Sequence, residues 1–185
     1  MGASGAYDAE LESYRELART RASETDGEAF LNRHAEHAWI IVELLFRKAT
    51  ESVEILSGSL NPSIYGDERV IASAMGFLDR CLEPVPFQPS LFVLVENNGD
   101  WPTHPLISRV LNYFPTKLEV RRVPPEVRNA YDFHFMLADK RHFRCKKSRQ
   151  LPEAVVRFNS TETGESLHNL FQQVRMASEI IQLGA

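Results

Sequence analysis

Residues 131–144 of the chain read YDFHFMLADKRHFR. Strand-forming apolar residues lead to a tight polar turn at Asp139-Lys140, after which the chain returns as a second strand. This pattern predicts a hairpin whose first strand carries His134 and whose turn carries Asp139. An imidazole and a carboxylate in one hairpin make it a candidate site.

Strands and helices alternate around this hairpin. Hydrophobic periodicity predicts helices at 7–22, 25–49, 67–82, 104–114 and from 159 onward, and strands at 51–56, 90–96, 118–123 and 153–158. Such alternation favours a largely parallel sheet with helices on both faces, and the hairpin makes the sheet mixed. We therefore expect an α/β fold, built as a three-layer α/β/α sandwich.

The length of 185 residues suits one main domain. We expect residues 1–26 to form an N-terminal helix and connection, and residues 27–185 to form the α/β domain. Thr25 and Glu28 match a capping box, which places the start of the second helix near residue 25. The first helix is too short to be stable alone, so it must dock on its own domain or on another subunit.

Composition indicates a globular protein with a hydrophobic core. Hydrophobic residues make up 43% of the chain, which excludes a disordered tail or a disulfide-stapled miniprotein. Cys81 and Cys145 have no CxxC partner, so we expect reduced thiols.

No apolar run approaches the ~18 residues of a membrane helix, and the first residues lack a signal-peptide pattern. We therefore expect a soluble cytoplasmic protein without membrane contact.

Positive charge is concentrated in one part of the chain. The net charge is −4, yet the span from Arg109 to Arg149 holds eleven Lys and Arg residues against four acidic residues. Such a span can bind an anion such as nucleic acid. It can also be a solvated strand face, or a surface that contacts the acidic half of another copy.

The chain resembles the phospholipase D-like superfamily over roughly residues 30–182. The family motif is His-x-Lys-x-x-x-x-Asp on a strand. Asp139 fits the Asp, while His134 stands at the Lys position and Asp132 at the His position. The loop at 57–61 and the strand-plus-helix ending after Ala154 are also similar to the family.

The resemblance implies a degenerate active site. In the family the His attacks phosphorus, which requires an imidazole within reach, and the Lys stabilises the phosphate oxygens. Alternate strand residues share a face, so His134 points where the motif pair would lie, with Asp132 beside it. A carboxylate repels a phosphodiester, so we expect no hydrolysis by the family's usual route.

Three functions follow from this resemblance. The first is a pseudoenzyme that serves as an interaction or regulatory subunit in a bacterial defence or DNA-processing system. The second is a metal-independent phosphodiesterase or nuclease that works as a homodimer, with His134 and Asp139 as catalytic residues. The third is a binder of nucleic acid or a phosphorylated ligand without turnover. Whether the protein is an enzyme stays open at this point, with a non-catalytic role favoured.

The candidate binding residues come from the basic span and from the strand ends. Those expected to bind phosphate or nucleic acid are Arg121, Arg122, Lys140, Arg144, Lys146 and Lys147. Asn61, Tyr65 and Asp132 are expected to line a pocket, because ligands gather outside strand C-termini in open α/β sheets. No nucleotide-binding motif occurs, and His34 and His37 lack a third ligand, so we expect no cofactor and no metal.

Overall fold

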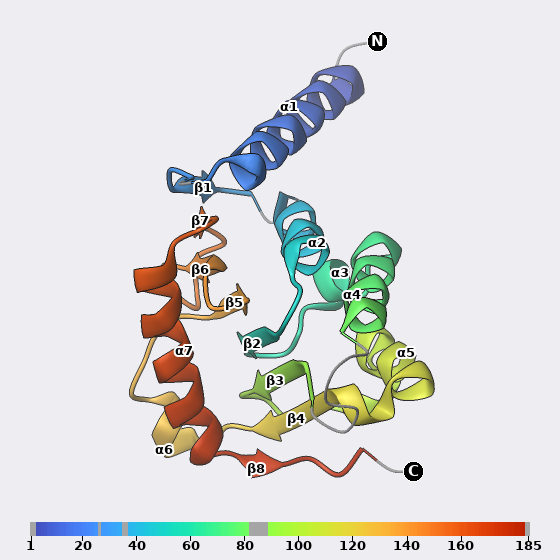
Figure 1. The fold of residues 1–185 in the computed structure, drawn as a ribbon, viewed down its shortest axis with the longest axis vertical. Coiled ribbons are helices and arrows are strands. Elements are labelled where there is room, and N and C mark those ends of the chain that lie inside the picture. The colour runs from blue at the N-terminus through green and yellow to red at the C-terminus, as the bar shows by residue number, and fades with distance from the viewer. Residues whose placement is uncertain (1–2, 26, 35–36, 82–88, 184–185) are drawn as a thin grey trace.

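The computed structural model describes residues 3–25, 27–34, 37–81 and 89–183 (Figure 1). Within these residues, eight strands form one sheet in the order β1-β7-β6-β5-β2-β3-β4-β8. The strands are β1 Phe30–Asn32, β2 Val53–Ser57, β3 Leu91–Val95, β4 Leu118–Arg122, β5 Phe135–Ala138, β6 His142–Lys146, β7 Ala154–Arg157 and β8 Glu179–Ile180. The helices are α1 Ala3–Ser23, α2 Ala38–Lys48, α3 Pro62–Tyr65, α4 Glu68–Arg80, α5 Pro105–Tyr113, α6 Pro125–Arg128 and α7 Thr161–Met176, with 3-10 turns at Trp101–Thr103 and Pro115–Lys117.

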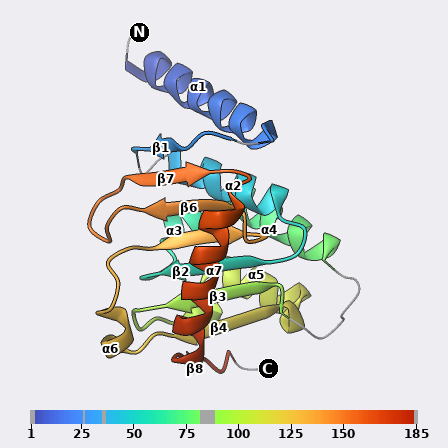
Figure 2. The same ribbon diagram turned by 60° about the vertical axis from the view of Figure 1, so that its left-hand side comes forward.

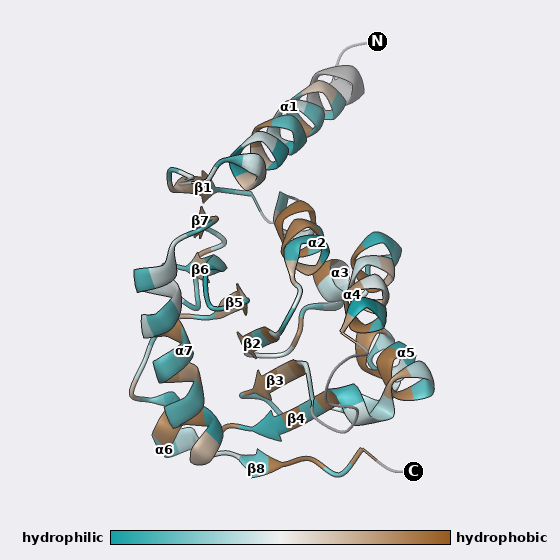
Figure 3. Cartoon of the chain, in the orientation of Figure 1, coloured by the Kyte–Doolittle hydropathy of each residue, from teal (hydrophilic) through white to brown (hydrophobic). Residues whose placement is uncertain are grey.

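The sheet is mixed, as the sequence predicts, and among the described strands two neighbouring pairs are parallel and five are antiparallel. β2, β3 and β4 run parallel, with Ile55 opposite Val93 and Val93 opposite Val120. The hairpin of β5 and β6 joins this parallel part through an antiparallel pairing of β5 with β2. β3 is hydrophobic along its length in Figure 3, which is typical of a strand covered on both faces.

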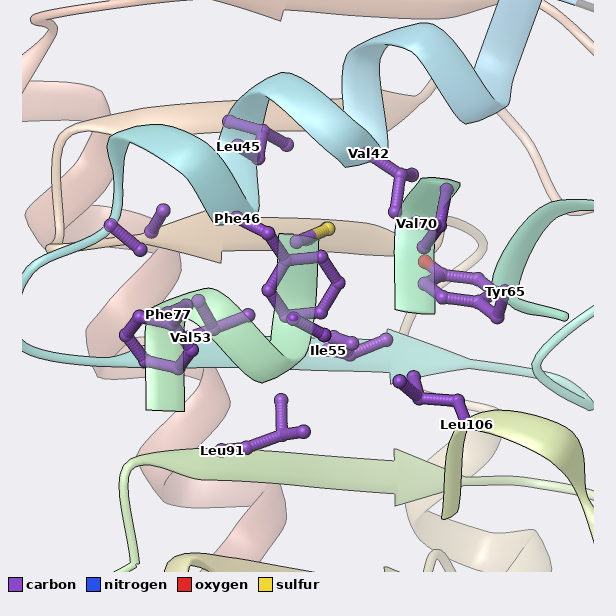
Figure 4. Close-up of a cluster of buried hydrophobic side chains, with 14 of the residues drawn as sticks. Val42, Leu45, Phe46, Val53, Ile55, Tyr65, Val70, Phe77, Leu91 and Leu106 are labelled. Carbon is purple, nitrogen blue, oxygen red and sulfur yellow. The ribbon is translucent and has the colours of Figure 1, made fainter. Parts of the chain in front are cut away.

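Helices cover the two faces unequally. α2, α3, α4 and α5 lie on one face, and α7 crosses the strands on the other (Figures 1 and 2). Figure 4 shows part of the core on the first face, where Phe46 of α2 and Phe77 of α4 pack beside Ile55 of β2. Leu56, the next residue of β2, packs on the opposite face with Phe171 of α7. The expected three-layer α/β/α arrangement is therefore present.

Local sequence explains where the main helices begin. The Asp67 side chain accepts a hydrogen bond from the backbone of Arg69 and caps α4, close to the predicted start. Asn61 caps α3 in the same way, with Pro62 at its first position. Pro105 occupies the first turn of α5.

The predicted helix over residues 25–49 is wrong in its first half. Residues 30–32 form β1, which pairs antiparallel with β7, and α2 begins only at Ala38. Phe30 lies opposite Val156 and stacks on Phe158, with 6.3 Å between the ring centroids. Strand pairing and the partial burial of Phe30 thus outweigh the local capping pattern, as tertiary contacts often do.

The N-terminal helix is present as predicted, whereas the C-terminal helix ends earlier than the sequence suggests. α1 projects away from the sheet in Figure 1, and its C-terminal part docks through the buried residues Ala18 and Ala22. The last helix ends at Met176, and the chain then continues as β8 rather than as helix. Ile181 instead follows β8, and its backbone N–H donates to the carbonyl of Val120 at 3.0 Å. None of the helices described here is long and apolar enough to cross a bilayer.

Candidate anion-binding site

A cavity of about 460 Å³ lies where β2 and β3 end and β5 begins. His134 directly precedes β5, whose first residue Phe135 pairs with Leu56 of β2. The strand order therefore brings the end of β2, the end of β3 and the hairpin to one edge of the sheet. The polar and charged lining residues are Ser57, Ser59, Asn61, Tyr65, Asn97, His134, Arg144, Lys146, Arg149 and Gln150.

His134 contacts a buried carboxylate. Its Nε2 atom lies 3.1 Å from Oε2 of Glu96, whose side chain is only 1% exposed. The contact is not aligned as a hydrogen bond, and Nε2 has no other hydrogen-bond partner within the described residues. Arg149 donates to the other oxygen, Oε1, at 2.9 Å. Burial raises the pKa of Glu96, but His134 and the charge of Arg149 outweigh it and hold that pKa below its usual value.

Arg144 carries a buried positive charge into the cavity. Its side chain leaves β6 on the face covered by α2, and the residue is only 8% exposed. Its Nε atom donates to Oδ1 of Asn32 at 2.8 Å. No carboxylate of the described residues forms an ion pair with Arg144, and burial lowers the pKa of its guanidinium. Burial raises the pKa of the neighbouring Tyr65 hydroxyl to about 12, so this phenol is neutral and does not offset the charge.

Lys146 adds a second cation two residues further along β6. Its Nζ atom donates to the carbonyl of Arg149 at 2.8 Å, which directs the side chain towards the loop after β6. Burial and the nearby charge of Arg144 both lower the pKa of Lys146. The two cations thus repel each other and together attract an anion.

The loop after β2 supplies neutral polar groups. Ser57 accepts a hydrogen bond from the backbone of Leu60 at 3.1 Å. Asn61 uses Oδ1 to cap α3, which fixes its amide at the cavity wall. A Cβ atom on Gly58 would lie 3.3 Å from Cε1 of His134, so the absent side chain allows the imidazole to pack against this loop.

The structure does not bring the expected catalytic pair together. Asp139 follows the far end of β5, opposite the end that carries His134. Its carboxylate accepts hydrogen bonds from the backbone of Thr50, Glu51 and Ser52 at 2.9–3.1 Å. Asp139 therefore anchors the connection between α2 and β2. Asp132 is exposed and is not among the residues that line the cavity.

The basic span does not form one surface. Arg121 pairs with Glu119 at 2.7 Å, Arg122 pairs with Glu179, and Lys147 pairs with Glu153 at 2.7 Å. Lys140 lies in the β5–β6 turn, at the end of the sheet away from the cavity. Of the expected phosphate-binding residues, the cavity gathers Arg144 and Lys146, together with the expected pocket residues Asn61 and Tyr65.

Sequence reasoning missed four residues that shape this site. Glu96 and Asn97 directly follow the apolar strand β3, and the rule that ligands gather at strand C-termini points to them. Arg149 belongs to the basic span but was not singled out. Nothing in the sequence near Asn32 indicates a role in the site, because Asn32 contacts Arg144 only after the chain has folded.

The described residues contain no cluster of three or more His, Cys, Asp or Glu that could hold a metal ion. His37 stacks on Tyr14, with 4.2 Å between the ring centroids. Cys81 and Cys145 are not joined by a disulfide, and burial raises the pKa of the Cys145 thiol to about 11.

Comparison with known proteins identifies the fold. No family model and no curated protein matches the chain. It is similar in structure to TrmBL2, an archaeal chromatin protein with a novel mode of DNA binding, at a TM-score of 0.59 and 12% identity. The match covers 96% of this chain and 63% of TrmBL2, so the chain spans less than two thirds of that protein.

Two further structures are similar over nearly their whole length. One is Nuc from Salmonella typhimurium, a phospholipase D family member, with a TM-score of 0.57, 10% identity, and coverage of 84% of this chain and 97% of Nuc. The other is NucT from Helicobacter pylori, with a TM-score of 0.52, 11% identity, and coverage of 83% and 98%. At these identities the likeness shows the fold alone: the chain has a phospholipase D-like fold.

Proposed function

We propose that the cavity binds a phosphate-bearing ligand, and that binding rather than turnover is its main function. The observation that carries this proposal is Arg144, a cation that is 8% exposed and faces the cavity without a carboxylate partner. Burying an uncompensated charge is costly. An anionic ligand that accepts hydrogen bonds from the guanidinium offsets this unfavourable free energy when it binds.

Phosphate is the anion that best suits the lining. A guanidinium offers a planar fork of donors that matches phosphate oxygens, and an ammonium adds a point charge. Arg144 and Lys146 provide these two groups, and the hydroxyl of Ser59 and the amide of Asn97 add neutral donors at the wall. TrmBL2 and Nuc support a ligand from nucleic-acid or phosphodiester chemistry, because one binds DNA and the other is a phospholipase D family member.

Turnover by the family's usual route is disfavoured by the residue at the motif His position. Asp132 stands there, is exposed and carries no nucleophilic nitrogen. A module that binds without cleaving acts through a partner, so we propose a regulatory or interaction subunit, cytoplasmic and bacterial, in a defence or DNA-processing system. A homodimer is the simplest form of such an assembly.

The test is a titration with inorganic phosphate and with a fluorescent single-stranded oligonucleotide, using the wild type and Arg144→Met. Methionine keeps the apolar bulk of the side chain and removes the charge, and such replacements of buried ions are often tolerated. We expect the affinity to fall by about ten-fold or more, the scale of one charge-assisted contact.

The matched control is Arg122→Met, which removes an arginine that pairs with Glu179 outside the cavity. It should bind as the wild type does. If the wild type binds neither ligand, or if Arg144→Met binds both as well as the wild type does, the proposal is wrong.

A metal-independent phosphodiesterase is the second candidate, favoured by the contact between His134 and Glu96. A buried carboxylate that orients an imidazole is the arrangement that activates a nucleophile. An imidazole nitrogen would form a bond to phosphorus as the bond to the leaving oxygen breaks, and water would then cleave the phosphorus–nitrogen bond. Arg144 and Lys146 would stabilise the developing charge.

Turnover of fluorescent single-stranded and double-stranded DNA in EDTA separates the two candidates. An enzyme should lose activity in His134→Ala and in Glu96→Gln while both variants stay folded. Because single-motif members of the phospholipase D-like superfamily build such sites across a two-fold axis, light scattering should then report a dimer. Absence of cleavage by the folded wild type would exclude this second function.

A further inference from the structure

We infer that the ligand of this cavity is a terminal phosphate monoester rather than an internal phosphodiester. The inference rests on the proposed function and specifies the chemical class of its ligand. It follows from the charge that the cavity leaves uncompensated and from the depth at which Arg144 lies.

The charges around the cavity leave an excess of two positive units. Three cationic side chains line it, those of Arg144, Lys146 and Arg149. One carboxylate lies directly behind the wall, that of Glu96, and it pairs with Arg149 at 2.9 Å. Three cations against one carboxylate leave two positive charges, carried by Arg144 and Lys146, with His134 counted as neutral. Arg128 also contacts Glu96, at 3.4 Å, but its side chain is 43% exposed to solvent and does not line the cavity.

A monoester matches this excess better than a diester does. A phosphate monoester carries a charge of about −1.5 to −2 at neutral pH, whereas an internal diester carries one negative charge. Arg144 and Lys146 are two residues apart on one strand, so their like charges repel each other; burial and this repulsion both lower the pKa of Lys146. A dianion compensates both cations, while a diester leaves one of them unpaired.

The position of Arg144 adds a steric argument. The guanidinium is nearly buried, and its Nε atom is tied to the fully buried Asn32 behind it. Ala38 of α2 and Tyr65 of α3 line the cavity on the helix side. A terminal phosphate can reach the guanidinium of Arg144 while its single ester substituent extends towards the cavity opening. An internal phosphate would have to bring two flanking esters into the same space.

The monoester has two possible sources with the same chemistry, a small phosphorylated compound and the phosphorylated end of a nucleic-acid strand. The experiment therefore uses two pairs of ligands at pH 8, where the monoester is a dianion. The first pair is methyl phosphate and dimethyl phosphate. The second pair is one oligonucleotide with a 5′-phosphate and the same oligonucleotide with a 5′-hydroxyl.

We expect methyl phosphate to bind about ten-fold more tightly than dimethyl phosphate, or better, since one additional charge-assisted contact is worth about that factor. Lys146→Met should reduce this preference to about three-fold or less. The matched control is Lys147→Met, because Lys147 is the next residue but pairs with Glu153 outside the cavity. It should keep the full preference.

The two pairs of ligands distinguish a small phosphorylated compound from a phosphorylated nucleic-acid end. A ten-fold preference for the 5′-phosphorylated oligonucleotide supports a nucleic-acid end, and a preference confined to the methyl phosphates supports a small compound. Equal binding within both pairs overturns this inference but leaves the proposed function standing. Failure of all four ligands to bind overturns the proposed function itself.

Discussion

The Nε atom of Arg144 donates a 2.8 Å hydrogen bond to Oδ1 of Asn32, which joins two buried side chains from strands on either side of β7. The Asn32 amide nitrogen in turn donates to the backbone carbonyl of His34 at 2.8 Å, which fixes the orientation of the amide. Arg144 is thus held in place by a neutral group and keeps its charge for the cavity. β1 therefore has a part in the site although it lies at the edge of the sheet.

Asn32→Asp should weaken anion binding while the protein stays folded. The replacement is nearly isosteric and places a carboxylate against Arg144, so that a buried ion pair replaces the free cation. We expect affinity for inorganic phosphate to fall by about ten-fold, measured by calorimetric titration. Asn32→Ala is the comparison, because it removes the anchor but leaves the charge, and should lose less affinity. Wild-type affinity in Asn32→Asp would contradict this account of Arg144.

Asp139→Ala should lower the free energy of unfolding by about 3 kcal/mol, because it leaves backbone donors of residues 50–52 without an acceptor. Phosphate affinity should not change, since Asp139 lies at the end of β5 away from the cavity. Urea denaturation measures the first quantity and titration the second. Asp132→Ala, which removes an exposed carboxylate just before the same strand, should leave the stability within about 0.5 kcal/mol of wild type.

Gly164→Ala should destabilise the contact between α7 and the hairpin. A Cβ atom on Gly164 would lie 2.0 Å from the carbonyl oxygen of Lys140, which is backbone and cannot rotate away. We expect a loss of about 2–3 kcal/mol in thermal or urea unfolding, as for an overpacked core. Gly76→Ala is the matched control in α4, where the nearest atom is the flexible end of Arg80 at 3.6 Å. That variant should gain about 0.5–1 kcal/mol through helix propensity.

His142 should make the fold sensitive to mild acid. Burial and the charges of Arg141 and Lys48 lower the pKa of His142 from 6.5 to about 4, and its Nδ1 atom accepts a hydrogen bond from the backbone of Asn159 at 3.0 Å. Because the folded-state pKa lies below the unfolded one, the stabilisation is complete above pH 6.5 and is lost as pH falls towards 4. The loss is on the order of 3 kcal/mol.

His142→Asn tests this assignment, because asparagine keeps an acceptor near the position of Nδ1 and does not titrate. The free energy of unfolding is measured for both proteins at pH 7.5 and at pH 4.5. The wild type should lose more stability than the variant over this interval. Equal losses would show that other groups cause the acid sensitivity.

Sequence periodicity predicted the central elements well, because their signals are local. Residues 91–95 are apolar and uninterrupted, and β3 matches the strand predicted at 90–96 with one residue less at each end. The β5–β6 hairpin was likewise visible from its turn, where Asp139 and Lys140 adopt positive φ angles of 51° and 55°. β1 was missed because a three-residue strand is specified by its partner β7 rather than by its own pattern.

The site was only partly predictable, for a related reason. His134, Arg144 and Lys146 share one hairpin, so the sequence brought them together. The Asp139 position of the family motif was recognisable, but only the fold shows that its carboxylate binds backbone amides at the far end of β5. Glu96 meets His134 across the sheet, and no spacing in the sequence encodes that contact.

The sheet ends at both edges in very short strands, the three residues of β1 and the two residues of β8. Short edge strands offer few free backbone donors and acceptors to a neighbouring molecule. Strand-by-strand extension into a continuous intermolecular sheet is therefore disfavoured, and with it one common route to aggregation. We expect any partner of this protein to recognise its side chains and to leave the backbone ladder closed.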